Sequence, residues 1–357
     1  MLNEPGSAVE LPLPSFHRPS QADDWAFAPS VPAIHEAAEF WRKGHGIPSA
    51  AADRRKVHLF LVDTQKDFCF PGGSLFVGGR SGRGALDDTR RLVEFIYRSL
   101  AEITEITVTL DTHFPHQIFF PSFWRDESGN APAPHQFVTG DDVRAGRLRP
   151  RVDLASWLAD GDSKWLLRQA EFYCDELEAT GKYRLYLWPP HCLLGGEGHL
   201  LVGAVQQARL FHAFVRGARN DLVVKGDEPL TECYSVFAPE VRTRFDGGPL
   251  GTRNHALARR LLEADVVIIA GQAASHCVKN SVEDLLGEIE GVDPRLATKV
   301  YLLQDCMSAV AVPDVDRPGA FLADFTPEAE EAMGRFARAG VHIVRSTDPI
   351  ASWPGLE

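Results

Sequence analysis

The chain has 357 residues, of which 44% are hydrophobic and 24% are charged, as in a folded globular protein. Its net charge of −12 speaks against nucleic acid as a partner, because a phosphate backbone is bound by a basic surface. No apolar run has the length of a membrane span, and the N-terminal residues lack the pattern of a secretory signal. Six scattered cysteines without a CxxC pair indicate a reduced environment, so we expect a cytoplasmic protein.

Residues 1–55 are rich in proline, alanine and serine, which predicts an extended N-terminal arm. One short helix is expected within the arm, at residues 33–43, where apolar residues recur with helical spacing. The aromatic residues Trp25, Phe27 and Trp41 indicate that the arm packs on the rest of the protein or on another subunit. We therefore do not expect a catalytic motif in this part of the chain.

From residue 56 onward, short apolar runs alternate with amphipathic stretches. The runs predict strands at 57–63, 103–111, 183–188, 221–225, 266–269, 299–305 and 341–346. The amphipathic stretches predict helices at 86–100, 155–180, 200–219, 255–263, 327–339 and after residue 277. This alternation favours an α/β class fold, with three α/β/α layers and a mostly parallel central sheet of about six strands. Residues 56–357 are thus expected to form a single domain, with insertions near 120–180 and 240–255.

The stretch DVVIIAGQAASHCV, at residues 265–278, carries a cysteine between a buried strand and a helix. At such a position, free backbone N–H groups and the helix dipole lower the pKa of a thiol, and the thiolate is a nucleophile. Taken alone, Cys277 is more simply explained as a small buried apolar residue. Its chemical role therefore depends on what the other strand ends contribute.

Several strands end in a charged or reactive residue. These residues, at or just beyond the carboxyl ends of the apolar runs, are Asp63, Asp111, Lys225, Cys277 and Asp305. Ligands of open α/β sheets bind outside those ends, so we expect the five side chains to share one edge. Strands that merely end where polarity begins would explain an acid or two. They would not easily explain a lysine directly after LVV and a cysteine after AASH.

Three of these positions lie in segments that resemble the nicotinamidases and isochorismatase-like cysteine hydrolases. The segments are DTQKDFCFPGGSLFVGG, VVKG and GQAASHCVKNSVEDL, and the resemblance covers roughly residues 56–346. It implies the isochorismatase-like hydrolase fold and a catalytic triad of Asp63, Lys225 and Cys277. It also implies a cis peptide bond directly before Ala273.

The chemistry of such a triad follows from its residue types. Asp63 would take the proton of Cys277, because burial makes a carboxylate a better base, and Lys225 would favour the charged nucleophile. The thiolate would attack an amide carbonyl, and the N–H groups of Ala273 and Cys277 would form the oxyanion hole. Ammonia would then leave, and water would cleave the thioester.

A second group of residues indicates a metal. Asp111 and His113 in LDTHFPHQIFF, together with His191 in WPPHCLLGGEG, resemble the metal ligands of nicotinamidases. One carboxylate and two imidazoles suit a single divalent ion, zinc, iron or manganese, with open coordination positions. His116 is a spare candidate ligand. A lone DxH motif would usually be a solvated strand end, so the prediction depends on its combination with His191.

Aromatic residues suggest a flat substrate. Phe68, Trp188 and Tyr234 match the positions that enclose the pyridine ring in nicotinamidases, although each alone would be typical of a core. We therefore expect a metal-dependent amidohydrolase acting on nicotinamide or a related heteroaryl carboxamide, in a homo-oligomer. Two alternatives stay open: a hydrolase of another small amide or ureide, and a metal-bearing binding protein without turnover. Departures at Gly196, Glu197 and Ser275 leave the substrate open.

Overall fold

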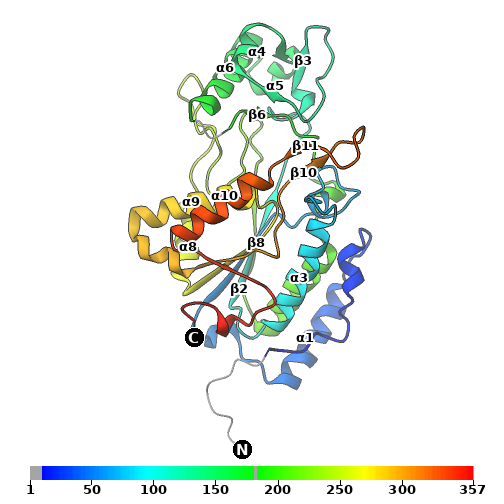
Figure 1. The fold of residues 1–357 in the computed structure, drawn as a ribbon, viewed down its shortest axis with the longest axis vertical. Coiled ribbons are helices and arrows are strands. Elements are labelled where there is room, and N and C mark those ends of the chain that lie inside the picture. Colours follow the sequence, from blue (N-terminus) through cyan, green and yellow to red (C-terminus); the bar gives the residue numbers. More distant parts are fainter. Residues whose placement is uncertain (1–9, 181–182, 357) are drawn as a thin grey trace, which may run out of the picture.

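A six-stranded sheet forms the centre of the computed structural model, which describes residues 10–180 and 183–356. All neighbouring strands run parallel, in the order β12-β9-β8-β1-β2-β7 (Figure 1). The strands are β1 (Val57–Val62), β2 (Glu105–Asp111), β7 (Asn220–Lys225), β8 (Val266–Gly271), β9 (Val300–Leu303) and β12 (His342–Val344). Residues 1–9 of the predicted arm, and 181, 182 and 357 of the predicted domain, lie outside the described residues.

Helices cover both faces of this sheet (Figure 1). One side carries α1 (Val31–His45), α3 (Gly84–Arg98) and α7 (Gly203–Arg216). The other side carries α8 (His255–Glu263), α9 (Cys277–Val292) and α10 (Thr326–Arg338). The predicted three-layer α/β/α fold is therefore confirmed.

The central strands are buried because both of their faces are covered. β1 and β8 pair with each other along their whole length, and every residue in them is buried. Their sequences, VHLFLV and VVIIAG, are the near-continuous apolar runs that such strands require. β7 is an edge strand and exposes Leu222 and Val224.

An inserted lobe between β2 and β7 lies beyond the carboxyl ends of the strands (Figure 1). Its elements are β3 (Trp124–Asp126), β4 (Phe137–Val138), α4 (Gly140–Arg144), β5 (Leu148–Pro150), α5 (Ala155–Leu158), α6 (Ser163–Thr180) and β6 (Leu185–Tyr186). β3 pairs with β5 and β4 with β6, both antiparallel.

Two predictions for this lobe were wrong in detail. The helix expected at 155–180 is broken into α5 and α6, because Asp160 and Gly161 adopt positive φ values of +48° and +87°. The strand expected at 183–188 shrinks to β6 and pairs with β4 outside the central sheet. Pro189 and Pro190 come after Leu187 and Trp188, and neither proline can donate a ladder hydrogen bond.

The described part of the N-terminal arm packs on the sheet domain. Its helix α1 lies against α7, and the ring of Trp25 lies 5.5 Å from that of Phe70. The predicted boundary at residue 55 stays a prediction. Among the described residues, no helix is long and apolar enough to cross a membrane.

The remaining elements are short. In the part of the chain that the structure describes, they comprise α2 (Lys66–Cys69), a hairpin of β10 (Ala311–Pro313) and β11 (Phe321–Asp324), and seven 3-10 helices: η1 (Pro19–Asp23), η2 (Ala50–Ala52), η3 (Pro121–Phe123), η4 (Val152–Leu154), η5 (Glu197–His199), η6 (Pro294–Lys299) and η7 (Ile350–Ser352).

Candidate active site

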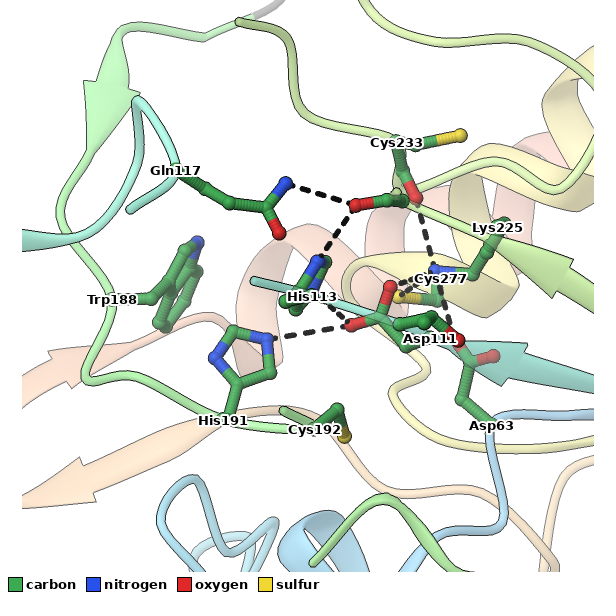
Figure 2. A network of polar contacts seen from close by, with 12 residues as sticks. Asp63, Asp111, His113, Gln117, Trp188, His191, Cys192, Lys225, Cys233 and Cys277 are labelled. Carbon is green, nitrogen blue, oxygen red and sulfur yellow. Dashed lines mark hydrogen bonds and ion pairs between the residues drawn. The ribbon is translucent and has the colours of Figure 1, made fainter. Parts of the chain in front are cut away.

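Three neighbouring strands bring two acids and a lysine together at one edge of the sheet. Asp63 directly follows β1, and Asp111 and Lys225 are paired in register at the ends of β2 and β7. The Nζ atom of Lys225 lies 3.0 Å from Oδ2 of Asp63 and 2.8 Å from Oδ1 of Asp111 (Figure 2). It also donates to the carbonyl of Cys233 at 2.9 Å. These partners hold the lysine in one position at the sheet edge.

Cys277 joins this group from the adjacent strand. It is the first residue of α9, which follows β8 after a short turn. Its Sγ atom lies 3.6 Å from Nζ of Lys225, and its side chain is buried. The three residues of the predicted triad therefore come together, as the strand-end pattern indicated.

The turn before α9 leaves two backbone N–H groups free. Within the described residues, neither the Ala273 nor the Cys277 amide donates a hydrogen bond. By contrast, the amides of His276 and Val278 both donate to the carbonyl of Ala273. The Gln272-Ala273 peptide bond is cis, as the family resemblance implied. The two free amides are thus available to a ligand atom beside the thiol.

Burial sets the direction of the pKa shift for Asp63 and Cys277, and neighbouring carboxylates set it for Lys225. Burial raises the pKa of Asp63, against the nearby charge of Lys225, and it raises the pKa of Cys277 well above its usual range. Burial alone would lower the pKa of Lys225, but Asp111 and Asp63 outweigh it and hold that pKa well above normal. The lysine is therefore a fixed cation, while the acid is a stronger base than an exposed aspartate.

Thr109 supports Asp63 from the neighbouring strand. Its hydroxyl donates to Oδ1 of Asp63 at 2.5 Å and accepts from the Asp63 amide at 3.0 Å. Thr109 was not predicted as a site residue from the sequence. Thr107, Thr109 and Asp111 alternate along β2, so polar residues at every second position of a buried strand were the available signal.

The Thr109 contact leads to a prediction. Thr109→Val keeps the shape of the side chain but removes both hydrogen bonds to Asp63. We expect unfolding free energy to fall by about 1–3 kcal/mol, because buried polar groups lose their partner. Thermal or urea unfolding measures this effect. Thr109→Ser restores the hydroxyl and should recover most of the loss; equal destabilisation by both substitutions would assign the effect to packing.

A second cluster forms beside the triad from Asp111, His113 and His191. Nε2 of His113 lies 2.8 Å from Oδ2 of Asp111, and Nε2 of His191 lies 3.4 Å from the same oxygen. All three side chains are buried, and their ligand atoms lie within 4.8 Å of one another. Burial by itself would raise the pKa of Asp111, but the neighbouring His113 and Lys225 side chains outweigh it and hold that pKa well below its usual value.

Backbone carbonyls orient both imidazoles. Nδ1 of His113 contacts the carbonyl of Gly226 at 2.9 Å, and Nδ1 of His191 contacts that of Pro189 at 2.8 Å. If each Nδ1 carries the proton, each Nε2 presents a lone pair towards Asp111, which is the arrangement of metal-binding histidines. Gly226 permits this approach, since a Cβ atom there would lie 2.7 Å from the His113 ring.

The loop that carries His191 is tied to both neighbouring segments. The amide of Cys192 donates to Oδ2 of Asp67 at 2.7 Å, and its carbonyl accepts from the His113 amide at 3.0 Å. These contacts fix His191 relative to His113. The residues present therefore fit a divalent cation, with one anionic oxygen and two imidazole nitrogens converging on one point.

Two other predicted residues lie apart from this site. Asp305 accepts hydrogen bonds from the amide and hydroxyl of Ser346, because β9 lies two strands away from β1. It therefore joins the end of β9 to the chain after β12. His116 is not among the described residues whose ligand atoms converge in the cluster.

Cys277 of the triad and the three residues of the cluster line one small cavity with about 420 Å³ of empty volume. The three predicted aromatic residues, Phe68, Trp188 and Tyr234, line it, and Nε1 of Trp188 donates to the Tyr234 hydroxyl at 2.8 Å. Glu232 and His276 also line the cavity and were not predicted. Glu232 does not stand at the end of an apolar run, so strand ends alone could not reveal it. His276 directly precedes Cys277 in the turn after β8, and that position was the available signal.

Comparison with known proteins gives one relative by sequence and several by structure. No protein-family model matches the chain. Over 138 residues it is 29% identical to the nicotinamidase of Escherichia coli strain K12, a match that covers 38% of this chain and 52% of that protein. The match thus spans about half the length of the relative, and it confirms the resemblance to nicotinamidases that the motifs indicated.

The solved structures that align with the chain include the following three. An Acinetobacter baumanii nicotinamidase and pyrazinamidase aligns with a TM-score of 0.47 and 18% identity, over 83% of this chain and 99% of that one. The yeast nicotinamidase bound to nicotinaldehyde aligns with a TM-score of 0.48 and 17% identity, over 81% of this chain and 99% of that one. A Pyrococcus horikoshii pyrazinamidase in complex with zinc aligns with a TM-score of 0.41 and 19% identity, over 81% of this chain and 99% of that one.

Proposed function

We propose that this chain is a metal-dependent cysteine amidohydrolase that converts nicotinamide, or a closely related heteroaryl carboxamide, into the acid and ammonia. The observation that carries the proposal is the position of Cys277, 3.6 Å from Lys225, which in turn lies 3.0 Å from Asp63. The sequence match to a nicotinamidase supports the same reaction. A homo-oligomeric assembly and a cytoplasmic location stay predictions from the sequence.

The first step is formation of the nucleophile. The proton of the Cys277 thiol passes to the Asp63 carboxylate, whose pKa is raised by burial. Lys225 stays cationic beside both groups and offsets the negative charge that the sulfur gains. The transfer therefore separates no charge across the buried site, because the anion moves from one neighbour of the lysine to another.

The second step is attack on the amide. The thiolate sulfur bonds to the carbonyl carbon, and the carbonyl oxygen gains negative charge next to the free amides of Ala273 and Cys277. Asp63 returns its proton to the amide nitrogen, the C–N bond breaks, and ammonia leaves. Water then attacks the thioester with Asp63 as the base, which releases the acid and restores the thiol.

The remaining residues position the substrate. Phe68, Trp188 and Tyr234 would enclose a flat ring, since they line the cavity above Cys277. Asp111, His113 and His191 would hold the divalent ion. When bound, the ion would offer an open coordination position to a ring nitrogen. A flat ring carrying a nitrogen and a carboxamide thus matches all three parts of the cavity.

A substrate comparison tests this proposal. Benzamide has the ring shape and carboxamide of nicotinamide but lacks the ring nitrogen, so its kcat/KM is expected to be lower by about 100-fold or more. The measurement is ammonia release from nicotinamide, pyrazinamide, benzamide and an aliphatic ureide. Equal rates for benzamide and nicotinamide would refute anchoring through the ring nitrogen. A clear preference for the ureide would identify a different small-amide hydrolase.

A further inference from the structure

An open cleft adjoins the catalytic cavity. It has about 1170 Å³ of empty volume, against about 420 Å³ for the cavity. Tyr234 and His276 line both hollows, which therefore adjoin at these two residues. A molecule bound with its amide at Cys277 would therefore have space beyond the cavity, on the side of these two residues.

The inserted lobe builds one wall of the cleft. Phe137, Tyr183 and Tyr186 lie on β4 and around β6 of that lobe, while Asn280 on α9 and Phe325 before α10 form the opposite wall. The cleft thus exists because the lobe stands over the carboxyl ends of the strands (Figure 1). This gives the insertion a direct part in shaping what reaches Cys277.

Aromatic rings in contact with one another extend from the cavity to the rim of the cleft. The Trp188 ring lies 4.5 Å from that of Tyr186, which lies 5.0 Å from Phe137, its cross-strand partner. On the other wall, the Phe325 ring lies 4.7 Å from His276. Phe137 is 43% exposed at the outer end. Such a row of rings suits a flat apolar group, because aromatic rings gain from contact with one another.

The cleft meets the cavity at the thiol end and not at the metal cluster. Its lining includes Ser275, His276 and Lys279, which flank Cys277 along the chain. The described residues that line the cleft do not include Asp111, His113 or His191 of the metal cluster. In the proposed orientation, the ring nitrogen of the substrate lies at the metal cluster and its carbonyl carbon lies at Cys277. A substituent that occupies the cleft is then attached to the amide nitrogen of the substrate.

The charges around the cleft favour an uncharged group. Arg184 and Lys279 line it together with Glu178 and Glu328, so two cations are matched by two anions. Arg184 lies over the Phe137 ring, with its Cζ atom 4.4 Å from the ring centroid. A charged substituent would find no excess of the opposite sign there.

We propose that this cleft is a subsite for the leaving amine, and that the protein accepts N-substituted heteroaryl carboxamides whose N-substituent is flat and uncharged. The inference rests on the proposed amidohydrolase function. Cys277 Sγ bonds to the carbonyl carbon, the C–N bond breaks, and the amine leaves with the proton that Asp63 held. Water then cleaves the thioester to the same acid that nicotinamide would give.

Binding to the Cys277→Ala protein tests the subsite without turnover. We expect N-(2-phenylethyl)nicotinamide to bind about tenfold more tightly than nicotinamide, measured by calorimetry. Adding Phe137→Ala should remove most of this gain and leave nicotinamide affinity within about twofold. The matched control is Trp157→Ala, an exposed aromatic on α5 of the same lobe that does not line the cleft. Equal affinities for the two amides would overturn the proposal.

Turnover by the wild-type protein separates this inference from the proposed function. Nicotinate formation from both amides supports both proposals. Nicotinate from nicotinamide alone, with no tighter binding of the secondary amide, would show that the cleft is only an access route. If neither amide is hydrolysed, the proposed function fails, and the binding comparison still decides whether the cleft takes the substituent.

Discussion

Replacement of Cys277 by alanine is expected to lower kcat for nicotinamide hydrolysis by about 10⁴-fold or more, because the change removes the attacking atom. Ammonia and nicotinate release measure this loss directly. Substrate affinity should be kept, since the aromatic walls and the residues of the metal cluster are unchanged. The fold should also be kept, because only one buried sulfur is deleted.

Cys233→Ala is the matched control for this experiment. Cys233 lines the same cavity, but its thiol contacts the carbonyl of Ser235 and points away from Lys225 (Figure 2). Its contact with Lys225 is made by its backbone carbonyl, which alanine preserves. Activity should therefore stay within a few fold of wild type. Near-normal turnover by Cys277→Ala, or an equal loss in both variants, would remove Cys277 from the role of nucleophile.

The sequence alone was enough to predict that Asp63, Asp111, Lys225 and Cys277 lie close together. Each follows an apolar run, and parallel strands with buried faces place the ends of such runs at one edge. The strand order explains why Asp305, which also follows an apolar run, does not lie with these four residues. Its strand lies on the far side of β8 from β1, and no local pattern reveals which strands become neighbours.

The inserted lobe shows a second limit of local patterns. The apolar spacing of 155–180 is helical throughout, yet the turn at Asp160 and Gly161 splits the helix. Likewise, β6 has the composition of a sheet strand, but its partner is β4, which precedes it by about fifty residues. Contacts between distant segments decided these outcomes. The same holds for Glu232, which reaches the cavity from a segment without regular structure.

Removal of the His191 imidazole is expected to deplete the protein of metal. Wild-type protein purified without chelator should contain about one zinc, iron or manganese ion per chain. His191→Ala leaves only Asp111 and His113, so metal affinity should fall by more than about 100-fold, and kcat/KM for nicotinamide should fall at least as far. Elemental analysis gives the metal content independently of activity. Asp111 is less suitable for this test because it also pairs with Lys225.

His116→Ala separates loss of a ligand from loss of a nearby histidine. His116 lies in the same sequence motif as His113, but it is not one of the three converging ligands. Metal content and activity should therefore stay near wild type in this variant. Loss of metal in His116→Ala would show that His116 is a metal ligand. Unchanged metal content in His191→Ala would contradict the ligand set, because the two remaining ligands could not hold the ion as tightly as three.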